Sequence, residues 1–274
     1  MKHIYFLTIL FFSIASSVVS QEKTYLSNAI NVAGKQRMLG QRMAKNKVYI
    51  TANRRAKLAE QELNKTVAGF QKGLSILKKF APTPAVKHKV DIQEYFFKTY
   101  RKAILSNSRT SLNEVVQTNT LFLAVCDDVV TELINYSKTL PSQDKNQEYV
   151  ITKIAEATGA SGKLRYLTQR LTLYYAMHKL DVKNVTPAEV NEIVQTMDKN
   201  LNYLTVLEFN TIDIDDALGK VHYYWNQLKD NLYKNGTVDL NTQNLNADSM
   251  YDLCNTILDE ANKATKMYAD LNKS

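Results

Sequence analysis

Apolar residues recur at steps of three and four along most of the chain, which is the spacing that places side chains on one face of an α-helix. One such stripe consists of Leu63, Val67, Phe70, Leu74 and Leu77. Runs with the alternating pattern of β-strands are absent. The pattern therefore predicts an all-α protein in which the apolar stripes form the core.

The apolar stripes occur twice in the same order. Residues 63–77 match residues 190–204 at a distance of 127, and residues 96–104 match residues 224–232 at a distance of 128. Each copy contains four helical stretches joined by short connections, which favours antiparallel neighbours. The sequence predicts two tandem antiparallel four-helix bundles related by internal duplication, with these bounds: residues 21–142 and residues 143–274.

Several short motifs indicate where helices begin and end. Ser111-Leu-Asn-Glu114 and Thr186-Pro-Ala-Glu189 have the spacing of capping boxes. Asn235-Gly236 is a turn dipeptide, and we expect it to join helical segments. Aromatic pairs and triplets at 96–97, 174–175 and 223–225 are expected to pack in the bundles rather than form a ligand cage, since the matching positions are apolar in both copies.

The amino terminus has the layout of a secretory signal. Residues 1–3 form a short positive segment, residues 4–15 are apolar or weakly polar, and small residues precede Gln21. The apolar run is shorter than the roughly 20 residues that span a bilayer. We expect cleavage after Ser20 and export to the periplasm or the exterior. Retention of the segment as an uncleaved anchor is the alternative.

The two cysteines, Cys126 and Cys254, are too few for a disulfide framework and have no histidines at metal-ligand spacing. We expect both to be buried and to pack as small apolar residues. A single bridge between them is the alternative in an oxidising compartment.

The first helix of each copy carries the basic pattern Gly-Lys-x-Arg-x-x-x-Gln-Arg, at residues 34–42 and 162–170. Nine basic residues and no acidic residue lie between Glu22 and Glu60. Helices that only need solubility usually mix both signs, because opposite charges four residues apart add a few tenths of a kcal/mol per pair. The one-sided charge therefore favours binding of a negative ligand.

The glycine and the arginine of the pattern lie on one helical face. Glycine inside a helix costs about 1 kcal/mol relative to alanine, but it lets another backbone or a ligand approach closely. An arginine one turn further on presents a planar, charged fork of donors that suits a planar oxyanion. Two arginines 4 Å apart would repel by about 4 kcal/mol at an effective dielectric constant of 20. An anion between Arg37 and Arg165 would remove that cost.

Residues 31–43 resemble the signature of NarX-like and PilJ-type N-terminal sensor domains, found outside the membrane in nitrate/nitrite sensor kinases and methyl-accepting chemotaxis transducers. The resemblance implies a four-helix bundle whose first helices meet at a symmetric interface and hold one nitrate or nitrite ion. Together with the second copy of the pattern, it gives these expected ligand-binding residues: Gly34, Lys35, Arg37, Gln41, Arg42, Gly162, Lys163, Arg165, Gln169 and Arg170.

The chain departs from the family pattern in several places. Gly40 stands where such domains commonly carry Ser or Thr, and Gly159 replaces Asn31 in the second copy. We therefore expect an asymmetric second half-site, and the two patterns could meet within one chain or across a homodimer. Such sensors normally continue into a transmembrane helix and a signalling region. Neither follows in this sequence, so the signal is expected to pass through an envelope partner protein.

Two other kinds of function stay open. In the first, the chain is a secreted helical scaffold or adaptor without a small-molecule ligand, because likeness of fold does not establish function. In the second, the stretch from Lys35 to Lys57 binds an acidic surface such as anionic lipid or polysaccharide, although its apolar face is discontinuous. A pI of about 9.2 permits nucleic-acid binding, but export and the lack of a recognised motif argue against it.

Catalytic and metal-binding patterns are missing from the sequence. His88, His178 and His222 are solitary along their helices, without the spacing that brings ligands together on a metal. Residues 213–216 lack the glycine and glutamate of a calcium loop and are expected to be a solvated helix start. We expect no catalytic residue, no metal and no cofactor.

Overall fold

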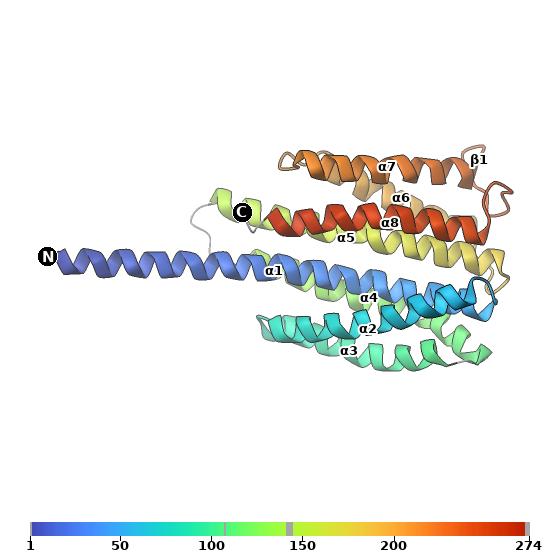
Figure 1. The fold of residues 1–274 in the computed structure, drawn as a ribbon, viewed down its shortest axis with the longest axis horizontal. Coiled ribbons are helices and arrows are strands. Elements are labelled where there is room, and N and C mark those ends of the chain that lie inside the picture. Colours follow the sequence, from blue (N-terminus) through green and yellow to red (C-terminus); the bar gives the residue numbers. More distant parts are fainter. Residues whose placement is uncertain (1, 107, 141–144, 272–274) are drawn as a thin grey trace.

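The computed structural model describes the backbone of residues 2–106, 108–140 and 145–271, and the side chains of residues 25–106, 108, 110–140 and 149–271. The described residues form eight helices and one short hairpin (Figure 1). The helices are α1 (Lys2–Thr51), α2 (Ala56–Phe80), α3 (Pro84–Leu105), α4 (Arg109–Ser137), α5 (Lys145–Lys179), α6 (Pro187–Thr205), α7 (Ile212–Leu232) and α8 (Ala247–Asp270).

The helices form two sets of four, which confirms the predicted all-α bundle fold. In the first set, α1 packs against α2 and α4, and α3 packs against α4. In the second set, α5 packs against α6 and α8, and α7 packs against α8. The two sets are joined mainly by α1 and α5, which run side by side in the same direction (Figure 1). The patterned helices of the two halves therefore meet within one chain.

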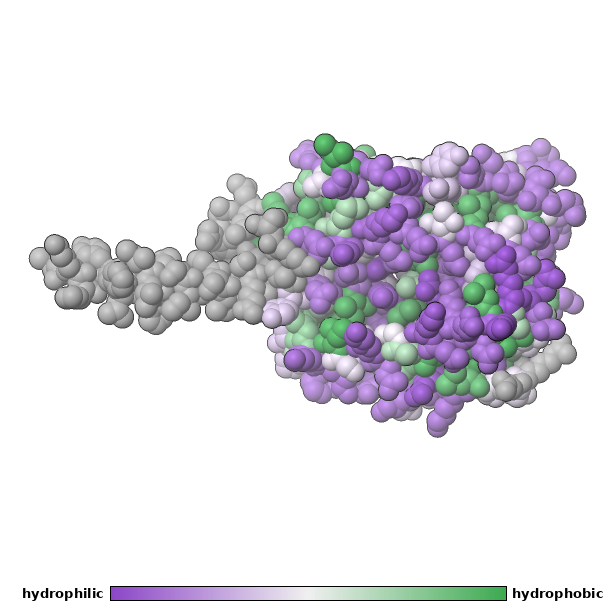
Figure 2. All heavy atoms as spheres, in the orientation of Figure 1, coloured by the Kyte–Doolittle hydropathy of each residue, from purple (hydrophilic) through white to green (hydrophobic). Residues whose placement is uncertain are grey.

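The predicted apolar stripes form the core. All five members of the stripe at residues 63–77 are buried, as are their counterparts at residues 190–204. Tyr223 is an exception to the predicted aromatic packing, because its side chain is 60% exposed. It lies two residues, or about 200° of helix rotation, from both Val221 and Trp225, which face the core. Because the apolar stripes face the core, hydrophilic side chains predominate on the face of the molecule shown in Figure 2.

The helix starts follow their capping residues. Thr186 forms the predicted capping box with Glu189, and Pro187 occupies the first turn of α6. The box predicted at Ser111 is wrong. Helix α4 begins at Arg109 because Ser108 accepts a hydrogen bond from the backbone N–H of Ser111, which caps the helix one turn earlier.

The turn at Asn235-Gly236 joins two short strands rather than helical segments. Strand β1 (Tyr233–Lys234) pairs antiparallel with β2 (Thr237–Val238). Asn235 and Gly236 have φ angles of 51° and 79°, as a two-residue hairpin turn requires. The expectation that this turn joins helical segments is therefore wrong, because two residues on each side are too few to show an alternating pattern.

The predicted signal segment, residues 1–20, and the predicted boundary between the halves, at residues 142 and 143, lie outside the residues whose side chains are described. In the part of the chain that the structure describes, no helix is both long and apolar enough to cross a membrane.

Candidate functional site

Helices α1 and α5 approach each other closely at a pair of glycines from the two basic patterns. A Cβ atom added to Gly34 would lie 3.7 Å from the Cα of Gly162, and one added to Gly162 would lie 3.6 Å from the Cα of Gly34. The same two positions touch both arginines. A Cβ on Gly34 would lie 2.9 Å from Nη2 of Arg165 and 3.5 Å from Nη2 of Arg37. The glycines thus leave the space in which the two guanidinium groups converge.

Arg37 is almost fully buried, with 1% of its surface exposed. Its Nη1 donates a short hydrogen bond to Oδ1 of Asp127 on α4, and its Nη2 donates to the backbone oxygen of Gly159 at 2.8 Å. The guanidinium carbon lies 5.3 Å from the ring centre of Tyr166, which adds a cation–π contact. Arg37 therefore has one carboxylate partner, and that carboxylate is 44% exposed.

Arg165 is also buried, with 3% exposed, but its partners are neutral. Its Nη1 donates to Oδ1 of Asn31 at 2.9 Å, and its Nη2 donates to the backbone oxygen of Asn31 at 3.1 Å. Burial, and secondly the charge of Arg37, lowers the pKa of Arg165. Arginine stays protonated near neutral pH, so the lowered pKa means that the fold carries a cation without a compensating anion.

The contacts of the two arginines match at the 128-residue distance between the two basic patterns. Arg37 donates to the backbone oxygen of Gly159, and Arg165 donates to that of Asn31, the residue 128 positions earlier. The symmetry fails at the carboxylate. The position that matches Asp127 is Asn255, whose Oδ1 accepts from Gln169 at 3.3 Å. Of the two buried cations, only Arg37 thus has an acidic partner.

Both guanidinium groups have donors to spare. The Nε atoms of Arg37 and Arg165 are buried and form no hydrogen bond among the described residues. One turn further along α1, Gln41 is fully buried and neither its amide nitrogen nor its oxygen has a partner in the described part of the chain. Unsatisfied buried polar atoms are uncommon in native proteins and call for an explanation such as a bound ion or water.

The other basic residues of the two patterns share no hydrogen-bond partner with Arg37 or Arg165 among the described residues. Arg42 lies 3.4 Å from Oε1 of Gln169 through its Nε, and 3.7 Å from Glu62. Arg170 donates to the hydroxyl of Tyr174 at 2.7 Å. Lys35 is exposed, and Lys163 is partly exposed on the opposite helix. Although the Lys35 side chain is exposed, desolvation of its covered part, and secondly the charge of Arg165, lowers the pKa of Lys35.

The cations of α1 do find acidic partners, but on other helices. Arg54 and Arg55 pair with Asp248 and Asp252 on α8. Lys45, which is fully buried, has its Nζ 2.9 Å from Oε2 of Glu62 on α2. The lack of acids within residues 23–59 is therefore compensated by acids that the fold brings in.

Lys45 belongs to a second buried charged cluster. Its Nζ lies 3.7 Å from the ring centre of Tyr251, whose hydroxyl donates to Oε2 of Glu62 at 2.6 Å. Burial lowers the pKa of Lys45 to about 8, although Glu62 raises it. Burial alone would raise the pKa of Glu62, but Lys45, Arg42 and the hydrogen bond from Tyr251 together lower it to about 2. The cluster ties α1, α2 and α8 together.

Sequence reasoning missed the residues that complete these clusters. Asp127 and Asn31 hold the paired arginines, and Glu62 and Tyr251 surround Lys45. One signal was available in the sequence. Asp127 follows Cys126, whereas the residue that follows Cys254 at the matching position is Asn255, an amide in place of an acid.

Both cysteines are fully buried and free, as expected for small apolar residues in the core. Burial raises the pKa of each thiol to about 12. Among the described residues, no three His, Cys, Asp or Glu side chains are arranged to hold a metal ion.

Comparison with known families supports the resemblance seen in the sequence. Residues 18–117 match the model of the family described as type IV pili methyl-accepting chemotaxis transducer N-term. The match covers the first basic pattern and ends within α4. It confirms the PilJ-type resemblance for this stretch and suggests a sensor role in signal transduction. The NarX-like resemblance and the second copy stay predictions. No curated protein and no solved structure matches the chain.

Proposed function

We propose that this protein is a sensor module that binds one small monovalent oxyanion, nitrate or nitrite, between Arg37 and Arg165. The observation that supports this most directly is the charge balance: of the two buried guanidinium groups, only that of Arg37 has a carboxylate partner, and this carboxylate is half-exposed. A buried charge without a counter-charge is costly. A single negative ion would offset the excess and could accept hydrogen bonds from the unpartnered Nε atoms.

The proposal includes the internal duplication. The equivalent contacts of Arg37 with Gly159 and of Arg165 with Asn31 support two copies of one ancestral half-site. Because α1 and α5 bring both halves together in one chain, a homodimer is not required to complete the site. The family match to the first half supports a role outside the membrane, with a protein partner in the cell envelope that reads the bound state.

Isothermal titration calorimetry, paired with thermal unfolding, tests the proposal on the wild-type chain. At a nitrate concentration of 100 times the dissociation constant, the fold should gain about 2.7 kcal/mol. Chloride at the same ionic strength should give no such gain. Equal stabilisation by nitrate and chloride, or no heat of binding for nitrate or nitrite, would contradict the anion-sensor proposal.

The scaffold alternative has one observation in its favour: both arginines are already hydrogen-bonded to protein groups. It predicts that these bonds serve packing alone. The two functions can therefore be distinguished by changing the charge of the residues that bond the arginines and measuring the affinity for nitrate.

Asp127 competes with the ligand in our proposal, so Asp127→Asn should tighten nitrate binding. Removing a negative charge about 5 Å from the anion relieves about 1 kcal/mol once solvent screening of the exposed carboxylate is allowed for, or roughly fivefold in affinity. Asn31→Asp should do the reverse, because it gives Arg165 its own carboxylate, and we expect at least about tenfold weaker binding. Calorimetry of both variants measures the two changes.

Sulfate provides the control for this pair of variants. The wild-type site has an excess of about one positive charge, so the divalent sulfate ion should bind more weakly than nitrate. Asp127→Asn removes a negative charge and should reduce this difference in affinity. Weaker nitrate binding in Asp127→Asn would mean that Asp127 positions Arg37 for the ligand, and competition would be the wrong description.

A further inference from the structure

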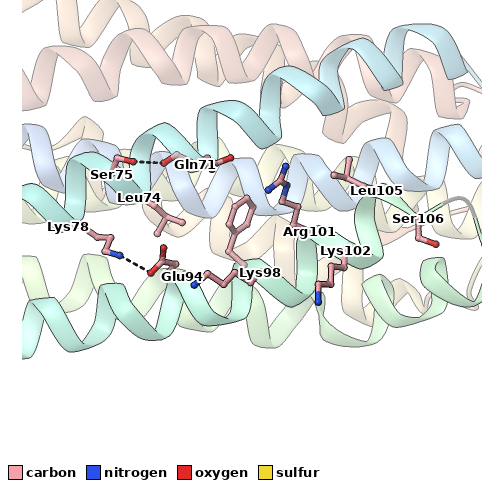
Figure 3. A pocket seen from close by; sticks show the side chains of 11 residues that line it. Gln71, Leu74, Ser75, Lys78, Glu94, Lys98, Arg101, Lys102, Leu105 and Ser106 are labelled. Atoms are coloured by element: carbon pink, nitrogen blue, oxygen red, sulfur yellow. Dashed lines mark hydrogen bonds and ion pairs between the residues drawn. The ribbon is translucent and has the colours of Figure 1, made fainter.

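A groove separates α2 from α3 on the side of the first bundle away from α5. It has a volume of about 790 Å³. Leu74 and Phe97 line its floor, and Leu105, which is 44% exposed, lines one end. Figure 3 shows Arg101 reaching from α3 toward α2, and Lys78 paired with Glu94 across the groove. The groove thus combines an apolar floor with a charged rim.

The rim has an excess of positive charge. Lys98, Arg101 and Lys102 line the groove, and their side chains form no hydrogen bond or ion pair within the described part of the chain. The second half differs at the matching place. There Asp198 on α6, the counterpart of Gln71, accepts from both Trp225 and Lys229 on α7, at 2.6 and 2.9 Å. Lys229 is the counterpart of Arg101, so the first half lacks the acid that neutralises this position.

The chain carries a complementary surface on its other half. The connection between α6 and α7 exposes Val206 at 75%, and Ile212, the first residue of α7, is 88% exposed. Glu208 and Asp213 are exposed beside them, and neither forms an ion pair among the described residues. We call Val206, Glu208, Ile212 and Asp213 the acidic tip. It presents apolar side chains that could contact the apolar floor of the groove, and negative charge that is opposite to the charge of the groove's rim.

The distribution of charge over the whole sequence points the same way. Residues 21–142 contain 20 basic and 9 acidic residues, whereas residues 143–274 contain 14 basic and 18 acidic residues. One half is strongly positive and the other negative, so copies of the chain attract each other head to tail at low ionic strength. The α6–α7 side lies across the molecule from α2 and α3 (Figure 1), which prevents a chain from filling its own groove.

We propose that the α2/α3 groove binds the acidic tip of a second copy of this chain. Because the contact joins two different surfaces, it can repeat from one copy to the next rather than stop at a dimer. It is independent of the proposed anion site, since none of these residues touches Arg37 or Arg165.

Sedimentation analysis of the full chain with charge-reversal variants tests this contact. The wild type should associate with increasing concentration at about 0.1 M salt, to masses beyond a dimer. It should dissociate at about 1 M salt, where the screening length falls from about 10 Å to about 3 Å. The groove variant Lys98→Glu/Arg101→Glu and the tip variant Glu208→Lys/Asp213→Lys should each associate at least tenfold more weakly.

Mixing the two variants is the decisive measurement. The reversed groove of one then faces the reversed tip of the other, and the two unchanged surfaces also match, so association should return. Lys199→Glu/Lys266→Glu is the matched control and should behave as wild type. A wild type that stays monomeric to about 1 mM, association that survives the groove and tip reversals, or a mixture that does not recover would each overturn the proposal. So would a monomeric chain whose groove captures an added acidic peptide or anionic amphiphile.

Discussion

Replacing Arg165 with methionine is expected to abolish nitrate-specific stabilisation while leaving the ligand-free protein at least as stable as the wild type. The guanidinium is buried and has only the neutral oxygens of Asn31 as partners. Replacing buried charged groups by apolar residues of similar volume is often neutral or stabilising by about 1–4 kcal/mol. The same change removes charge-assisted hydrogen bonds to the anion, worth about 1.5–3 kcal/mol each. Two such bonds correspond to at least about a 100-fold loss of affinity.

Thermal unfolding with and without nitrate measures both effects in one experiment. Arg170→Met is the control, because it makes the same substitution on the same helix at a side chain that bonds Tyr174 instead. It should keep the nitrate effect. If Arg165→Met unfolds the protein or retains nitrate binding, Arg165 is a structural residue and the site has been misplaced.

Gly34→Ala gives a second test in which the charge is unchanged. The added methyl carbon would lie 2.9 Å from Nη2 of Arg165, closer than real contacts allow, so the guanidinium must move. We expect weaker nitrate binding with both arginines present. Gly219→Ala is the matched control, because no atom lies within 4 Å of a Cβ at that position.

The second large effect is expected at Glu62. Glu62→Gln should destabilise the fold by about 3 kcal/mol at pH 7, because breaking a buried ion pair leaves Lys45 without a counter-charge. The pKa of Glu62 in the folded protein is lowered to about 2 from an ordinary value of 4.5. A carboxyl with a lowered pKa contributes stability that is fully present above pH 4.5 and is lost as the pH falls toward 2.

The difference in the free energy of unfolding between wild type and Glu62→Gln should therefore shrink as the pH falls from 4.5 to 2, and it should vanish below pH 2. Denaturant unfolding across this range measures it, with Glu60→Gln as an exposed control on the same helix. A difference in the free energy of unfolding between wild type and Glu62→Gln that stays constant down to pH 2 would show that the ion pair does not control stability.

Lys45 affects stability at high pH. Its pKa is lowered to about 8, so the folded protein should become more stable as the pH rises from 8 toward 10.5.

Helices and their buried faces could be predicted from the sequence because helical periodicity is local. The stripe from Leu63 to Leu77 and its counterpart at residues 190–204 are buried as their spacing required. Prediction failed where a signal was very short or had a close competitor. Ser108 displaced the cap expected at Ser111, and a hairpin of two residues per strand formed around Asn235.

The candidate site was predictable only in part. Gly34 and Arg37 lie on one face of α1, and Gly162 and Arg165 lie on one face of α5, because residues three apart share a helical face. Their pattern, repeated at a distance of 128 residues, singled them out before any fold was known. Sequence spacing also grouped Lys35 and Arg42 with them, but it does not show that Arg42 lies against Gln169 on α5 and Glu62 on α2.

The tertiary structure alone decided which groups meet. Sequence left open whether the two basic patterns face each other in one chain or across two, and packing of α1 against α5 places them together in one chain. Asp127 reaches Arg37 from a residue 90 positions away, and Tyr251 reaches Glu62 from 189 positions away. Such contacts depend on the register between packed helices, which is set by side-chain shape over the whole core. The sequence therefore determined where the two arginines lie on their helices, and helix packing determined the charge that surrounds them.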